Sequence, residues 1–392
     1  MQLDKMKPKA SLRETLRVRS QPDAASPPSL DGFLAVKSDV YQGLPLPTYT
    51  SGIDLSHDGA SLLLPPKRLL DPIVEPYFRH ITAVVPLIGR QACLQAIDRH
   101  YNPEVPFVGI EPAWVILLNY MILFCFVGQY MPLDRPSTDI DVGSVTHFEK
   151  PFVTNIRRSF AVIDRLLSPR LVNVQALLAL TLISQRYFSE HITQYLLNLT
   201  CFVAKSIGLH EQRGVHDGLS ADDMDERKRV FSCLFIVDKD VSMLLGTPPN
   251  FHHQDCDVEC PRDATYDYRL RLDSSILFGK VYNKLYSPAV ARASLPTVER
   301  SIDDLLADLD NFQCAIDNGS PSEMDSMSQR AWKFLKLEQR HFVHHARLMV
   351  LRRSSLPAKY AQRLTEARQC IETIARVRAA RPTVGGFMVL RR

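Results

Sequence analysis

The sequence predicts an all-helical protein. Glycine is scarce, at 16 residues, whereas proline is common, at 26, and this balance is typical of helices separated by proline-marked breaks. From about Leu69 onward, apolar residues recur with the helical period, and there is little of the alternation expected of strands. The 392 residues, 45% hydrophobic and 23% charged, are enough to bury a large core. We therefore expect an irregular domain of about nine or more helices.

Three segments are expected along the chain. Residues 1–66 carry eight prolines and no sustained apolar period, which predicts a disordered, proline-rich leader. Residues 67–380 are expected to form the helical domain, and residues 381–392 a short basic tail. Successive helix pairs share no signature, so a regular solenoid is not predicted. The helices are expected at 73–98 with a break around Pro86, 112–130, 150–167, 171–188, 190–207, 220–245, 266–286, 297–316, 328–353 and 358–379.

The most apolar of these segments is a core helix rather than a membrane span. The run Trp114–Val127 is interrupted only by Asn119. A span needs about 20 apolar residues, so this shorter run predicts a buried helix, and a membrane role is not expected.

The helix from Ser220 has the clearest start and end. Ser220 can cap it, acidic residues follow in its first turn, and Gly246 with two prolines behind it ends it. Asp238 and Lys239 interrupt its apolar face. An ionised carboxylate there needs a partner, so we expect a buried ion pair with Arg229 or with a basic residue of another helix. A titrating functional carboxylate is the alternative.

Charge is distributed unevenly. Arg330 to Arg392 hold fifteen Lys or Arg and three Glu, a net charge of +12, whereas the whole chain carries +4. Solvated helix faces explain this excess, and an anion or nucleic-acid surface is the alternative. Six basic residues among the first nineteen could serve as a nuclear-import signal.

Two groups of side chains have the composition of metal ligands. His252, His253, Cys256 and Cys260 lie close together in the sequence, but their spacing matches no standard zinc site. His341, His344 and His345 could share a helix face. Both groups are interpreted as structural, and no catalytic or metal-ligating residue is expected.

The block from Leu219 to Pro261 resembles the fungal-specific transcription factor domain, the middle homology region of fungal zinc-cluster regulators. That family has an acidic helix start, basic residues, an Asp-basic step, a Leu-Gly-x-Pro-Pro turn and an acidic loop ending in proline. Ser232 departs from the pattern, because an aromatic residue is usual there. Val174–Leu178 and Ala204–His210 resemble further blocks in the family's order, and the resemblance covers about residues 69–380. The signature residues here are Arg229, Phe231, Asp238, Lys239, Gly246, Pro248, Pro249, Asp257 and Pro261.

The resemblance implies a transcription regulator: a nuclear, helical regulatory domain that controls RNA polymerase II transcription and is not a catalyst. The family's zinc cluster needs Cys-x-x-Cys pairs, and this sequence has none, so we expect a partial family member without a metal cofactor. DNA is then expected only through a missing module or a partner protein, and DNA-binding residues are not assigned. Other expected partners are the transcription machinery, a zinc-cluster protein and a small-molecule effector. The alternatives are a co-regulator acting through protein–protein contact and a helical enzyme that processes a small molecule.

Overall fold

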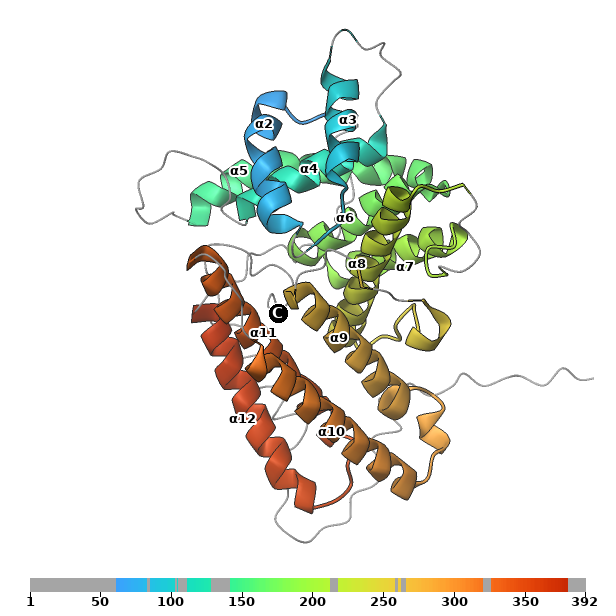
Figure 1. Cartoon of the computed structure of the whole chain (residues 1–392), viewed down its shortest axis with the longest axis vertical. Coiled ribbons are helices and arrows are strands. Elements are labelled where there is room, and N and C mark those ends of the chain that lie inside the picture. The colour runs from blue at the N-terminus through green and yellow to red at the C-terminus, as the bar shows by residue number, and fades with distance from the viewer. Residues whose placement is uncertain are drawn as a thin grey trace, which may run out of the picture. The chain divides into compact units, whose positions relative to one another are not determined.

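The computed structural model describes residues 61–82, 85–102, 104, 111–127, 142–211, 218–257, 260–261, 266–319 and 326–379. Within these ranges all regular structure is helical, which confirms the predicted fold class (Figure 1). The expected leader, apart from residues 61–66, and the expected basic tail lie outside the described residues. The α-helices are α2 (Lys67–Pro76), α3 (Arg90–Tyr101), α4 (Pro112–Val127), α5 (Val142–Arg158), α6 (Leu171–Tyr187), α7 (Glu190–Ser206), α8 (Ala221–Leu245), α9 (Tyr266–Val281), α10 (Leu295–Asn318), α11 (Ser326–Leu351) and α12 (Ala358–Ala379).

Most helix boundaries agree with the sequence to within a few residues, and the larger differences lie near prolines. The expected helix at 73–98 is broken near Pro86, as predicted. Helix α2 starts earlier than expected and is followed by a π turn at Tyr77–Ile81, and the link at residues 85–89 before α3 is not helical. Pro86 lies in that link, where proline disfavours helical geometry in the residue before it. The expected helix at 150–167 begins earlier, at Val142, and its second half is a 3-10 segment, Ser159–Leu167.

The first apolar core surrounds α4 and α6. Every side chain of α4 from Ala113 to Cys125 is at most 8% exposed. Asn119, its polar residue, donates from Nδ2 to the Val115 carbonyl at 2.7 Å, so no buried amide is left without a partner there. Among the described residues, no helix combines the length and apolarity required to cross a membrane. The run at 114–127 is a core helix.

Gln175 of α6 ties the link before α3 to the start of α8. Its Nε2 donates to the Leu87 carbonyl and to Glu226 Oε1, each at 2.9 Å. The Gly89 amide donates to the same Glu226 oxygen at 3.3 Å. A Cβ added at Gly89 would lie 2.9 Å from that oxygen, so a larger residue here would displace the Glu226 carboxylate.

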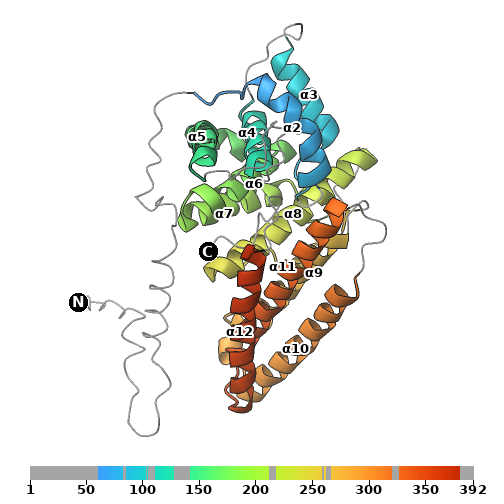
Figure 2. The same ribbon diagram turned by 90° about the vertical axis from the view of Figure 1, so that its left-hand side faces the viewer.

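A second apolar core lies among α9, α10 and α11, and α11 packs between α10 and α12 (Figures 1 and 2). Acidic residues of α10 pair with cations on the neighbouring elements. These pairs fix α10 on both of its sides at the protein surface, where each contributes little alone. The pairs are Asp303–Lys359, Asp304–Lys284, Asp308–Lys280, Asp310–Arg347 and Asp317–Arg340.

Candidate functional site

The signature residues gather on α8 and on the loop that follows it. The helix begins with the expected cap: Ser220 Oγ accepts from the Asp223 amide at 3.1 Å, and the Ser220 amide donates to the Asp223 carboxylate at 3.3 Å. It ends at Gly246, whose φ of 68° is the left-handed conformation that glycine adopts without strain. These local signals fix both ends of α8.

The loop after Gly246 is fastened to α8 by a set of buried polar contacts, here called the loop lock (Asp238, Lys239, Asn250 and Phe251). Asp238 is fully buried and accepts from the Asn250 amide at 2.9 Å and from the Phe251 amide at 3.1 Å. Lys239 Nζ donates to Asp238 at 2.8 Å and to the Phe251 carbonyl at 2.5 Å. The two charges therefore neutralise each other and satisfy the backbone of the loop.

The prediction that Asp238 pairs with Arg229 or with a basic residue of another helix was wrong. Arg229 pairs instead with Asp225, one turn away at 2.6 Å, and Lys239, the next residue along the chain, supplies the buried cation. The Lys239 ammonium also lies 4.0 Å over the Phe235 ring, a cation–π contact within the same helix. Gly279 of α9 lies beside the Lys239 stem, where an added Cβ would be in ordinary van der Waals contact, 3.5 Å from Lys239 Cε.

The remaining signature residues support the same loop. Phe231 is buried and its ring meets that of Phe251 edge-on, with 5.2 Å between centroids. Pro248 is exposed and its carbonyl accepts from Ser242 at 3.5 Å, whereas Pro249 and Pro261 are buried. The Asp257 amide donates to the His210 carbonyl at 3.0 Å. The arrangement joins the loop to α8 and to the end of α7.

A second buried group of charges joins α8, α9 and α11, and the sequence analysis missed it. Arg271 of α9 donates to Glu338 of α11 at 2.9 Å, and both side chains are at most 8% exposed. Asp240 of α8 is 9% exposed, and burial raises its pKa to about 7, against the attraction of Arg271. The Asp-Lys-Asp run inside an apolar helix was the available signal for Asp240. Nothing in the sequence marks Arg271 or Glu338 as buried.

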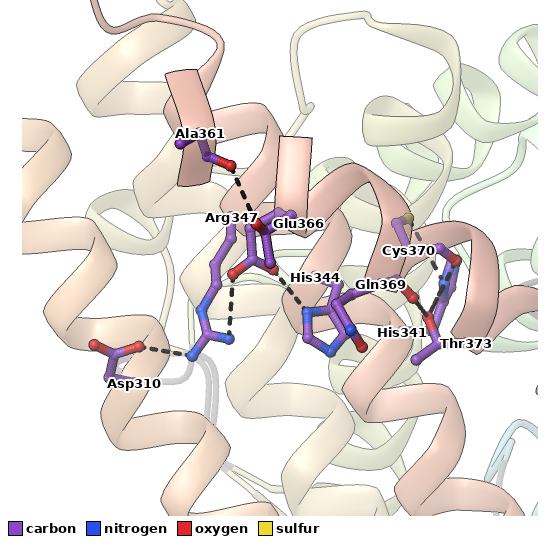
Figure 3. Close-up of polar contacts among 10 residues, drawn as sticks. Asp310, His341, His344, Arg347, Ala361, Glu366, Gln369, Cys370 and Thr373 are labelled. Carbon is purple, nitrogen blue, oxygen red and sulfur yellow. Dashed lines mark hydrogen bonds and ion pairs between the residues drawn. The ribbon is translucent and has the colours of Figure 1, made fainter. Parts of the chain in front are cut away.

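The seam between α11 and α12 is polar (Figure 3). His344 Nδ1 lies 2.7 Å from Glu366 Oε2, and Arg347 reaches both Glu366, at 3.8 Å, and Asp310 of α10, at 2.6 Å. His341 Nδ1 lies 3.1 Å from Thr373 Oγ1. Burial, followed by the nearby His345, lowers the pKa of His341 to about 4, so this imidazole is neutral at pH 7.

The metal-like groups do not form a site. Among the residues that the structure describes, no three His, Cys, Asp or Glu side chains are arranged to hold a metal ion, and both groups fall within those residues. Burial raises the pKa of Cys256 to about 11, and that of Cys370 to about 11. Such thiols are protonated at pH 7 and are poor nucleophiles.

Comparison with known proteins gives the same interpretation as the signature block. Residues 137–295 match the family described as the fungal specific transcription factor domain. This part of the chain is therefore similar to that domain. The match includes α8 and the loop lock, so the contacts of the loop lock lie within the matched residues.

Proteins that are similar to more than half of this chain are named as transcription factors. Transcription factor sphG of Aspergillus fumigatus is 26% identical over 356 residues, which is 83% of this chain and 45% of that protein. Transcription factor oryO of Aspergillus oryzae is 24% identical over 65% of this chain and 33% of its own length. Cutinase transcription factor 1 alpha of Fusarium vanettenii is 28% identical over 53% and 21%. The chain thus spans less than half the length of these curated relatives, and its likeness to them extends beyond the family match.

Proposed function

We propose that this protein regulates transcription in the nucleus, with the fungal transcription factor domain as its regulatory part. The observation that carries this proposal is the similarity to transcription factor sphG over 83% of the chain, with the family match inside it. Contact with DNA is made by another module or by a partner protein. The domain holds no zinc of its own.

The buried charges give this domain a mechanical role. The Asp240, Arg271 and Glu338 group lies where α8, at the edge of the first core, meets α9 and α11 of the second. Charges in such a place are unfavourable unless they remain paired, so a movement of one core relative to the other is resisted. Binding of a partner or small molecule to one core would therefore change the conformational equilibrium of the other. A regulatory domain requires such coupling.

The proposal is tested by tethering the full chain to a heterologous DNA-binding module and measuring a reporter gene. We expect reporter transcription to change at least severalfold relative to the module alone, in either direction. An Asp238→Ala variant, which breaks the loop lock, should lose the effect, whereas Asp222→Ala at the exposed start of α8 should keep it. An unchanged reporter at equal nuclear protein levels would contradict the proposal, as would stoichiometric zinc in the purified chain.

The co-regulator alternative differs in the partner that it requires. It predicts that the chain captures a separate zinc-cluster protein and reaches DNA only through it. Chromatin binding of the untethered chain should then disappear when that partner is deleted. Chromatin binding that survives the deletion would favour a DNA-binding module in the same protein.

A further inference from the structure

Helix α12 places polar residues toward the protein. Its side chains that face α11 include Glu366 and Thr373, which are 9% and 5% exposed and contact His344 and His341. Only near its end does an apolar side chain, Val377, become fully buried against α11. A helix at the surface normally turns its apolar face to the core, so the packed face of α12 is unusually polar.

The same helix exposes an apolar stripe, here called the α12 stripe (Tyr360, Leu364 and Ile371). These side chains are 50%, 57% and 70% exposed. Their separations of four and seven residues place them along one line of the helix. Single exposed apolar residues are common on protein surfaces, but an aligned set on a helix marks an interaction surface.

Two arginines flank the stripe on opposite sides. At 100° per residue, Arg363 and Arg368 fall to either side of the line through Leu364 and Ile371. Neither has a carboxylate partner among the described residues, and Arg363 lies 4.0 Å over the Tyr360 ring. Neighbouring cations are already paired, Lys359 with Glu299 and Asp303. Among the described side chains of α12, the positive charge without a carboxylate partner is therefore concentrated beside the exposed apolar residues.

We propose that the α12 stripe docks an acidic amphipathic helix of a separate protein. The apolar side of that helix would cover Leu364 and Ile371, and its carboxylates would pair with Arg363 and Arg368. The molecule already uses this recognition once: α10 lays an apolar face on α11 while its aspartates pair with Arg340 and Arg347.

Charge and composition argue for a separate chain as the occupant. A second copy of α12 laid on the first would set like charges against each other across a two-fold axis. The longest segment outside the described residues, 1–60, carries six prolines, which disfavours a long amphipathic helix there. This docking surface adds a partner to the proposed function without depending on it, because peptide binding is measured apart from transcription.

Fluorescence anisotropy of a labelled probe with the full chain tests the proposal. The probe is a synthetic helical peptide of about five turns, with leucines on one face and Glu and Asp on the others. Leu364→Ser with Ile371→Ser should weaken its binding at least tenfold, because two anchor side chains are lost. Phe202→Ser, at a residue of α7 that is 61% exposed, is the matched control and should leave binding unchanged.

The charged part of the surface is tested separately. Arg363→Gln with Arg368→Gln should weaken binding severalfold and reduce its dependence on salt. Arg300→Gln, at an exposed arginine of α10, should do neither. Equal binding of a scrambled peptide, or of the Leu364→Ser, Ile371→Ser chain, would overturn the proposal. A dimer in light scattering that this double variant dissociates would assign the face to a second copy and would overturn it too.

Discussion

Helices α8 and α12 both bury charged side chains, but they do so in opposite ways. On α8, Asp238 and Lys239 have side chains at most 1% exposed, and their partners are each other and the backbone of one loop. On α12, the side chain of Glu366 is 11% exposed, and its network runs through Arg347 to Asp310, whose side chain is 68% exposed. The first group is sealed, whereas the second reaches solvent.

This difference decides how each region responds to change. A sealed pair contributes little net stability, but removing one member leaves an uncompensated charge in a dry site. A network that reaches solvent can recruit water in place of a lost partner, so its members are individually weak. We therefore expect substitutions of the buried charges of α8 to be strongly destabilising, and substitutions in the α11–α12 seam to be tolerated better.

The largest expected effect is at the loop lock. Asp238→Ala leaves Lys239 buried without a counter-charge and frees two amides of the loop, so we expect a loss of about 3–5 kcal/mol in the free energy of unfolding. Urea unfolding at pH 7 measures it. Asp222→Ala, at an exposed acid in the first turn of the same helix, should cost under about 1 kcal/mol. Similar losses for the two variants would remove the contrast between sealed and open charges.

The next effect is a pH dependence from the group that joins the two cores. Burial raises the pKa of Asp240 from 3.8 to about 7; Arg271 and Lys239 oppose this rise, and Glu338 adds to it. Between about pH 4 and 7 the folded state then holds a proton that the unfolded state has released. Raising the pH through this window therefore lowers the free energy of unfolding, by about 4 kcal/mol.

Asp240→Asn keeps the shape of the side chain and removes its titration. The stability of the native chain relative to this variant should fall as the pH rises from 4 to 7 and stay level above that. Urea unfolding at pH 5 and pH 8 gives the comparison, and Asp222→Asn serves as the exposed control. Parallel pH profiles for the native chain and Asp240→Asn would show that Asp240 does not titrate in this window.

The ends of α8 could be predicted from the sequence, whereas the partners of its charges could not. Ser220, Asp223 and Gly246 act within one turn of the helix, so a few neighbouring residues determine the outcome. The partner of Asp238 depends on how a loop twelve residues away returns to the helix. Such contacts are fixed by the packing of helices, which periodicity alone does not specify.

In helix α12, too, periodicity alone does not specify which face packs against the protein. Its basic residues predict solvated faces, and Arg368 does lie on the surface. The sequence, however, offers two apolar lines, one through Leu364 and Ile371 and one ending in Val377, and either could face the core. The choice follows from α11, whose His341 and His344 require polar partners and so turn Glu366 and Thr373 inward.

The smallest expected effect is at the α11–α12 seam and has the opposite sign to that of Asp240. Burial first, and then His345 and His344, lowers the pKa of His341 from 6.5 to about 4, against a backbone hydrogen bond at Cys370. Between about pH 6.5 and 4 the unfolded state binds a proton that the folded state does not, so acidification lowers the free energy of unfolding by about 3 kcal/mol. His341→Gln, which can still bond Thr373, should lose this acid sensitivity, whereas His191→Gln at an exposed residue of α7 should keep it. Urea unfolding at pH 5 and pH 7 measures the acid sensitivity of each variant. Equal acid sensitivity in the native chain and in His341→Gln would show that another group titrates in this window. If His341→Gln removes only the loss of stability in acid and Asp240→Asn removes only the loss at higher pH, the two regions respond to pH independently.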